Sequence, residues 1–287
     1  MVIELILIPL TIIVLLIASY NDLRSREVPD WLSYGFLIAV LGIRAIFSVE
    51  YGWNIIISGV LGLLICFALA CLLYYTNQWG GGDSKVLMGM GALLGINIPL
   101  QSSSLNIFWF LLALLFLGAV YGLIWMGVLA LYHKTIFREQ WTLTLRHSKR
   151  WQITIALFTI GLAFLAVFYP FVWPIVPFPA VVLYLFLFVN TVERGCFYIY
   201  RAPKDLVEGD WLAQDVRSGV KKMLSAKTLE KEDIFLLKTM EVQKKLKKVL
   251  IKEGIPFVPV FLIALIIMVF FSSKLLALAY GLLAYFS

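Results

Sequence analysis

The sequence has 287 residues, of which 62% are hydrophobic and 14% are charged, and its mean hydropathy is +0.93. Such a composition excludes a soluble globular chain and predicts that most residues are used to cross a lipid bilayer. The net charge is +7, and the three cysteines (Cys66, Cys71 and Cys196) have no CxxC spacing. This cysteine pattern excludes a disulfide framework and a Cys-rich zinc site, and we expect no metal, cofactor or nucleic-acid partner.

Eight apolar segments approach the roughly 20 residues that a helix needs to cross the hydrocarbon core. In chain order they are Ile3–Tyr20, Trp31–Val49, Trp53–Tyr75, Lys85–Ile98, Leu105–Tyr132, Trp151–Phe168, Trp173–Val192 and Ile255–Phe271. The fourth is short and rich in glycine, so it is either a buried span or a re-entrant helix. The apolar tail Leu275–Phe286 is too short to count as a ninth crossing. The predicted fold is an all-α polytopic membrane protein with about eight transmembrane helices.

A single long polar stretch, Val192–Gly254, interrupts the apolar segments and carries 14 basic and 10 acidic residues. It divides the chain into a helical membrane core at 1–192, a basic cytosolic insertion at 193–254 and a C-terminal membrane segment at 255–287. Within Thr228–Glu253, apolar residues recur at a spacing that predicts an amphipathic helix. They are Ile234, Leu237, Val242, Leu246 and Val249. The alternative is a solvated connector near anionic headgroups.

The loop charges predict the orientation, because basic loops stay in the cytoplasm. Eight Lys and Arg residues lie in alternate loops and fourteen more lie in the insertion, so that 22 of the 24 fall on one side of an eight-crossing topology. This topology places the N-terminus outside the cell and the basic loops in the cytosol, with the protein in the plasma membrane.

Two carboxylates border the apolar core on that same predicted face: Asp22 follows the first span, and Asp83 precedes the fourth. Ionisable residues at such depths are costly and usually functional. A peptide bond can be hydrolysed by two paired carboxylates, one ionised to activate water and one protonated to polarise the carbonyl. Pairing itself produces this difference, since two like charges that lie close together cannot both ionise.

Three glycines, Gly80, Gly81 and Gly82, precede the second of these aspartates. Because glycine has no Cβ, these residues can adopt positive φ and can let an extended substrate strand approach the aspartates. The alternative, for an isolated Gly-Gly-Gly-Asp, is a flexible turn between helices. The presence of Asp22 on the same face favours the substrate-binding interpretation.

These motifs resemble the archaeal type IV prepilin peptidases, including the preflagellin (archaellin) peptidases, which are GxGD aspartyl proteases. Four stretches carry the resemblance: Asn21–Trp31, Gly80–Gly95, Glu208–Asp210 and Glu253–Pro259. The two aspartate motifs in this order are the most specific, and Glu-Gly-Asp is weak alone. Bacterial relatives often have a cysteine tetrad in a cytosolic loop and N-methylate the product. This sequence lacks that loop and its cysteines.

The resemblance implies that Asp22 and Asp83 form the catalytic dyad and that the cut falls just before the hydrophobic segment of a leader peptide. Its expected partners are the leaders of pilin-like or archaellin precursors and the lipid bilayer. Glu27, Asp30, Glu208 and Asp210 are expected to supply counter-charge for a basic leader. The expected substrate-binding residues are these four acids with Gly80, Gly81, Gly82, Pro256, Phe257 and Pro259.

Two other functions remain open. One is an intramembrane GxGD protease of the presenilin or signal peptide peptidase kind, which cuts within a transmembrane segment. The other is a transporter that couples protons through paired carboxylates, for which inverted repeats are expected and none is found. His133 and His147 lie in a predicted basic loop and are interpreted as solvated residues, and Arg44 is assigned no function. The oligomeric state is left open.

Overall fold

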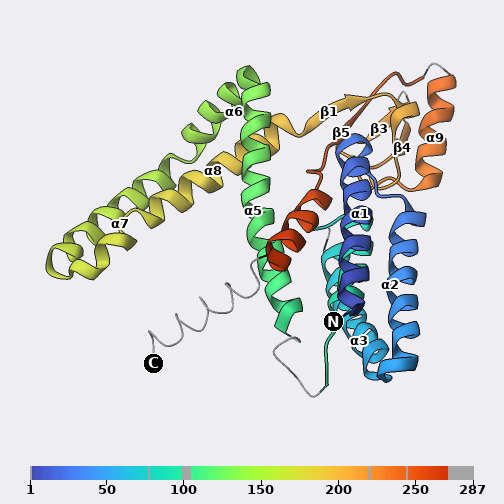
Figure 1. Ribbon diagram of the computed structural model, residues 1–287. Coiled ribbons are helices and arrows are strands. Elements are labelled where there is room, and N and C mark those ends of the chain that lie inside the picture. The colour runs from blue at the N-terminus through green and yellow to red at the C-terminus, as the bar shows by residue number, and fades with distance from the viewer. Residues whose placement is uncertain (1, 77, 99–104, 219–220, 244, 271–287) are drawn as a thin grey trace. The chain divides into compact units, whose positions relative to one another are not determined.

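The computed structural model describes residues 2–76, 78–98, 105–218, 221–243 and 245–270 (Figure 1). The chain divides into two compact units. Unit 1 comprises Met1–Tyr121 with Ile255–Ser287, and unit 2 comprises Gly122–Gly254. The apolar tail Leu275–Phe286 lies outside the described residues.

Unit 1 is helical. Its elements are α1 (Val2–Ser25), α2 (Asp30–Tyr51), α3 (Asn54–Tyr75), α4 (Gly81–Leu94), the first part of α5 (Asn106–Tyr132) and the unlabelled helix Val258–Phe270. Helices α1, α2 and α3 lie side by side in Figure 1. The helices of this unit bury an apolar core that includes Leu15, Val40, Leu87, Phe110 and Phe261.

Six helices of the described residues are long and apolar enough to cross a membrane. They are Ile3–Ser25, Asp30–Tyr51, Asn54–Tyr75, Asn106–Tyr132, Lys149–Phe168 and Pro170–Cys196. The chain is therefore an all-α polytopic membrane protein. The remaining two predicted segments correspond to shorter helices, α4 with 14 residues and Val258–Phe270, so the count of eight stays a prediction.

Glycines allow α3 and α4 to pack backbone against backbone. A Cβ placed on Gly62 would lie 2.2 Å from the carbonyl oxygen of Gly91, and one placed on Gly91 would lie 2.5 Å from the Cβ of Cys66. Such distances are far inside van der Waals contact, so a side chain at either position would force the helices apart. This close approach holds the short helix α4 against α3, and α4 also contacts α2.

Arg44, in the C-terminal half of α2, joins three helices at the end of unit 1 opposite Asp83. Its guanidinium donates to the carbonyl oxygens of Ile55 and Leu93, both at 2.7 Å, and to the hydroxyl of Ser58 at 2.9 Å. The Leu93 carbonyl belongs to the last turn of α4, where helix carbonyls have no partner within the helix. Arg44 thus satisfies that helix end and holds α4 against α3.

Unit 2 combines helices with short strands. Its elements are α6 (Lys134–His147), α7 (Lys149–Phe168), η2 (Pro170–Ile175), α8 (Phe178–Cys196), β1 (Tyr198–Arg201), η3 (Pro203–Asp205), β2 (Trp211–Leu212), β3 (Val216–Ser218), β4 (Lys221–Leu224), α9 (Lys231–Val242) and β5 (Val249–Lys252). Helices α7 and α8 form an antiparallel hairpin (Figure 1). The segment predicted to be a basic loop contains α6, so His147 lies in a helix rather than in a loop.

The amphipathic helix predicted within Thr228–Glu253 is correct only for its first half. Helix α9 begins after a capping box made by Glu230 and Asp233 and ends at Val242. Val249 lies instead in β5, the central strand of an antiparallel sheet with the order β1-β5-β2. A strand of four residues has too few alternations to be distinguished from a helical pattern when its partners lie far away in the sequence.

Candidate active site

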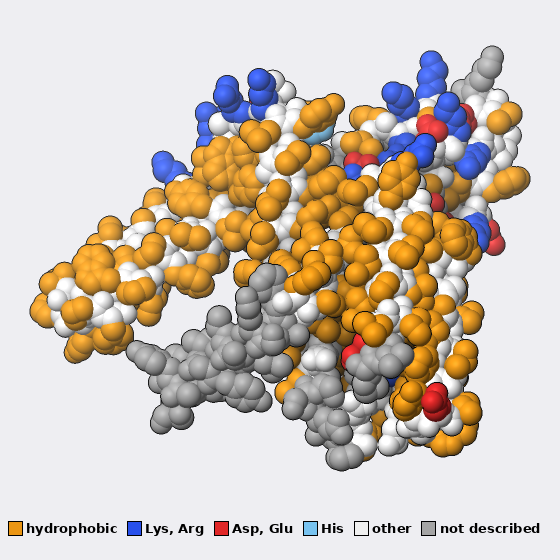
Figure 2. Space-filling model, viewed as in Figure 1, with side chains coloured by type: hydrophobic (Ala, Val, Ile, Leu, Met, Phe, Trp, Pro, Cys, Tyr) orange, Lys and Arg blue, Asp and Glu red, His pale blue; other side chains and the backbone are white. Residues whose placement is uncertain are grey.

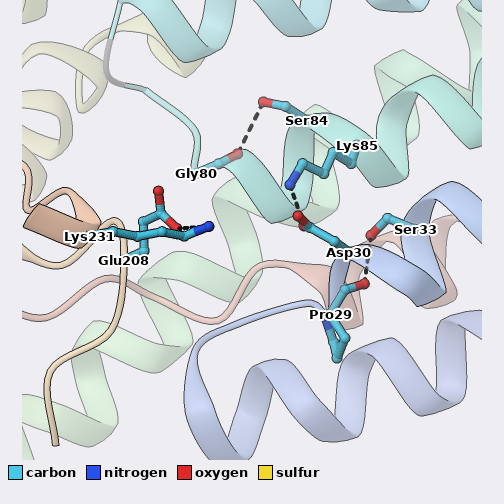
Figure 3. Close-up of polar contacts among 8 residues, drawn as sticks. All are labelled: Pro29, Asp30, Ser33, Gly80, Ser84, Lys85, Glu208 and Lys231. Atoms are coloured by element: carbon cyan, nitrogen blue, oxygen red, sulfur yellow. Dashed lines mark hydrogen bonds and ion pairs between the residues drawn. The ribbon is translucent and has the colours of Figure 1, made fainter.

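Five helix ends meet at one end of unit 1. The C-terminal ends of α1 and α3 lie near the N-terminal ends of α2, α4 and Val258–Phe270. Lys85 of α4 forms an ion pair with Asp30 of α2 (Figure 3), and its ammonium group lies 5.4 Å from the centre of the Tyr34 ring. A Cβ on Gly82 would lie 3.1 Å from the side chain of Val28, which follows α1. These contacts bring the two aspartate motifs together.

Asp22 is buried near the C-terminal end of α1, with 7% of its surface exposed. One carboxylate oxygen accepts a hydrogen bond of 2.9 Å from the backbone N–H of Val258, the first residue of the helix Val258–Phe270. The backbone N–H of Phe257 also donates to this carboxylate. The first N–H groups of a helix have no partner within the helix and carry partial positive charge. Asp22 therefore accepts hydrogen bonds from the first N–H groups at the start of this helix.

Asp83 lies in the first turn of α4, before the apolar part of that helix. Its carboxyl group accepts a hydrogen bond from the backbone N–H of Gly80. Burial away from water raises the pKa of Asp83 to about 7, and the negative charge of Asp22 acts in the same direction. Asp22 and Asp83 therefore lie close enough to interact electrostatically.

The three glycines before Asp83 do not use the positive φ that is accessible to glycine. Gly81 and Gly82 belong to the first turn of α4, and Gly80 has φ −74° and ψ 165°. The described glycines with positive φ are Gly52, Gly95 and Gly209. Helix formation that starts at Gly81 explains the difference, because helical residues have negative φ. The absence of a side chain at Gly82 allows close packing instead, because a Cβ there would crowd the side chain of Val28.

The Pro-Phe-Val-Pro segment positions the backbone groups that face Asp22. Pro256 is buried and precedes the helix, while Pro259 occupies its first turn, where the missing N–H costs nothing. The ring of Phe257 packs 5.2 Å from the ring of Trp79, centre to centre, and a Cβ on Gly118 would lie 2.5 Å from it. These contacts fix the N–H groups of Phe257 and Val258 beside the carboxylate.

The four acids expected to bind a basic leader differ in their surroundings. Glu27 lies in the loop between α1 and α2, and Asp30 forms the ion pair with Lys85. Glu208 and Asp210 belong to unit 2. Glu208 forms an ion pair with Lys231 (Figure 3). Asp210 accepts a hydrogen bond from the N–H of Val207 at 3.0 Å and forms an ion pair with Arg201. Burial raises the pKa of Asp210. Their role in leader binding stays a prediction.

Two residues near the dyad were missed by the sequence analysis. Tyr121 of α5 and Arg26, just after α1, both interact electrostatically with Asp22. Helix α1 ends at Ser25, and the next residue, Arg26, has φ 62° and donates its N–H to the carbonyl of Asp22 at 3.0 Å. Tyr121 lies in the middle of a long apolar helix, where nothing in the neighbouring sequence indicates a carboxylate partner. Its position near Asp22 becomes apparent only in the structure, where α5 approaches α1.

Comparison with known proteins finds a family match, and it includes both aspartate motifs. Residues 10–131, which include both aspartates, match the type IV leader peptidase family. The preflagellin peptidase of Methanococcus voltae is 35% identical over 114 residues, which are 37% of this chain and 48% of that protein. The corresponding enzyme of Methanococcus maripaludis (strain C6) is 38% identical over 93 residues, covering 31% of this chain and 39% of the relative.

The preflagellin peptidase of Methanocaldococcus jannaschii is 35% identical over 90 residues, 31% of this chain and 38% of the relative. The chain thus aligns with less than half the length of each of these three relatives. No solved structure matches the chain. The region that matches the type IV leader peptidase family, residues 10–131, contains Asp22 and Asp83 but not the Pro-Phe-Val-Pro segment that contacts Asp22.

Proposed function

We propose that the chain is a membrane-embedded aspartic endopeptidase that removes the leader peptide of type IV pilin-like or archaellin precursors. One observation carries the proposal: the charge of Asp22 acts on Asp83, while Asp22 itself is bound by the N–H of Val258. This arrangement supplies an ionised and a protonated carboxyl group in one site. The match of residues 10–131 to the type IV leader peptidase family and the names of the three relatives support the same reaction class.

In the proposed mechanism the two carboxyl groups have different tasks. Asp22, held ionised, takes a proton from water while the water oxygen attacks the scissile carbonyl carbon. Asp83, whose raised pKa of about 7 keeps its proton near neutral pH, donates to the carbonyl oxygen. When the tetrahedral intermediate collapses, the C–N bond breaks and the leaving amine receives the proton that Asp22 took. As the carbonyl of the new carboxyl group re-forms, a hydroxyl group of the intermediate returns its proton to Asp83, so that Asp22 is again ionised and Asp83 again protonated.

The proposed site faces the cytoplasm. The helix ends that surround the dyad carry Arg24, Arg26 and Lys85, and basic residues at membrane borders stay on the cytoplasmic side. The N-terminus of α1 then lies outside, in the plasma membrane orientation expected from the loops. A precursor whose hydrophobic segment is inserted in the bilayer presents its leader to this face, so that the cut falls at the membrane border.

Incubation of the purified protein in lipid bilayers with precursor peptides tests this function. We expect a leader-bearing pilin-like or archaellin precursor to be cut once, just before its hydrophobic segment, with the masses of both products fixing the position. The same precursors incubated with the Asp83→Asn variant are the negative control, in which we expect no cleavage. A cut inside the hydrophobic segment would identify an intramembrane protease of the presenilin kind, and a panel left intact by the wild-type protein would refute the proposal.

A further inference from the structure

Unit 2 contains an open cavity of about 660 Å³ between α6, the start of α7 and α8. One end of the cavity is polar. Its polar and charged lining residues are Gln140, Thr144, His147, Ser148, Asn190 and Arg194. None of the lining residues is acidic, so this end favours an anion.

An apolar groove of about 430 Å³ adjoins the cavity along α7 and α8. Trp151, Leu183 and Phe186 line both hollows, and Ile155 and Val182 continue the apolar surface of the groove. The two hollows therefore form one slot with a cationic, hydrogen-bonding end and a purely apolar end. This distribution of polarity matches that of an amphiphile, which has a charged head and an apolar chain.

Arg194 is available to a ligand at the polar end. It lies in the last turn of α8, is exposed, and forms no ion pair with any residue that the structure describes. Its acidic neighbour Glu193 is bound instead to Lys252 at 2.5 Å. A guanidinium group presents a planar set of donors that suits a phosphate group. His147 lines the same end, and because its Nδ1 lies 2.9 Å from the carbonyl oxygen of Leu143, Nε2 is the ring nitrogen left for a ligand.

The surroundings of the slot identify the source of the ligand. Helix α7 and the segment Pro170–Cys196 both have the length and hydropathy of membrane spans, yet only 6% and 11% of their most apolar stretches are buried. Figure 2 shows hydrophobic side chains covering this hairpin and Lys and Arg side chains gathered over α6. Span-length apolar helices with so little protein cover are in contact with lipid.

We propose that this slot binds one anionic phospholipid of the surrounding membrane, with the phosphate headgroup at Arg194 and an acyl chain along the groove. The charge of the cavity selects the headgroup, and the apolar groove selects a membrane lipid over a small soluble anion. The lipid holds α6 against the α7–α8 hairpin, because its headgroup contacts residues from α6 and α8. This site lies in unit 2 and does not depend on the proposed peptidase function.

Native mass spectrometry of the full-length protein tests the site with two lipids that have the same acyl chains, phosphatidylglycerol and phosphatidylcholine. We expect tighter binding of phosphatidylglycerol, and we expect Arg194→Gln to weaken it by about tenfold, the loss typical of one hydrogen bond to a charged group. Arg138→Gln is the matched control, since it removes the same charge from exposed surface of α6 outside the cavity. We expect it to change binding by less than about twofold.

Two further measurements distinguish binding of the whole lipid from binding of a soluble anion. Val182→Trp fills the apolar groove and should weaken phosphatidylglycerol binding while leaving Arg194 in place. Glycerol phosphate, the soluble headgroup, should not displace the lipid at equal concentration, because it makes no contact in the groove. Equal binding of both lipids, equal effects of Arg194→Gln and Arg138→Gln, or displacement by glycerol phosphate would each overturn the proposal.

Discussion

Replacing either Asp22 or Asp83 by asparagine is expected to abolish precursor cleavage, with a loss of at least about 10³-fold, within the range of general acid–base catalysis. In the Asp22→Asn variant the amide oxygen can still accept a hydrogen bond from the Val258 N–H, so the helix contact at 2.9 Å is kept while the base is lost. In the Asp83→Asn variant the amide group retains a hydrogen-bond donor but has no proton to transfer. Cleavage rates at a fixed precursor concentration check the result.

The control is Asp205→Asn, which makes the same chemical change at an exposed aspartate of unit 2. It should leave the rate within about twofold, as for most surface substitutions. The thermal unfolding temperatures of all three variants should remain close to that of the wild-type protein. Cleavage at the wild-type rate by either dyad variant would mean that the reaction does not use both carboxyl groups.

Replacing Arg44 by methionine is expected to cause a large loss of stability in unit 1. Three acceptors, the carbonyl oxygens of Ile55 and Leu93 and the hydroxyl of Ser58, lose their donor in a buried site. A buried acceptor without a partner costs about 1–3 kcal/mol. A total near 3 kcal/mol corresponds to a fall of roughly 6–12 °C in the unfolding temperature of a chain of this size.

The matched control for this substitution is Arg138→Met, which changes the same residue types at an exposed position of α6. Thermal unfolding of the purified proteins in one detergent compares the two. Because Arg44 holds the last turn of α4, whose first turn carries Asp83, the cleavage rate of the Arg44→Met variant should also fall. An unfolding temperature equal to that of Arg138→Met would show that the three hydrogen bonds do not hold α4 in place.

The proximity of Asp22 and Asp83 could be predicted from the sequence, because it follows from segment lengths and loop charges. The lengths of the apolar segments and the distribution of Lys and Arg place Asp22 and Asp83 on one face, and the Gly-Asp and Pro-Phe-Val-Pro motifs identify the helices that meet there. The helical membrane fold follows from the same signals. Both rest on patterns that extend over many residues.

The features that escaped prediction depend on contacts between distant residues. Arg44 binds backbone carbonyls, which any sequence supplies, so nothing near residue 44 indicates its partners. Tyr121 approaches Asp22 only because α5 packs in unit 1. Strand β5 has four residues, and its partners β1 and β2 lie on the other side of α9 in the sequence. Local periodicity contains no information on such pairings.

Infrared titration of the carboxyl groups tests most directly whether the two aspartates act on each other. In the wild-type protein, the band of one protonated carboxyl group should persist up to a pH of about 7, the raised pKa of Asp83. The band should be missing in Asp83→Asn, and in Asp22→Asn it should titrate at lower pH because the neighbouring negative charge is gone. An Asp83 band that titrates at the same pH with and without Asp22 would contradict the proposed pairing.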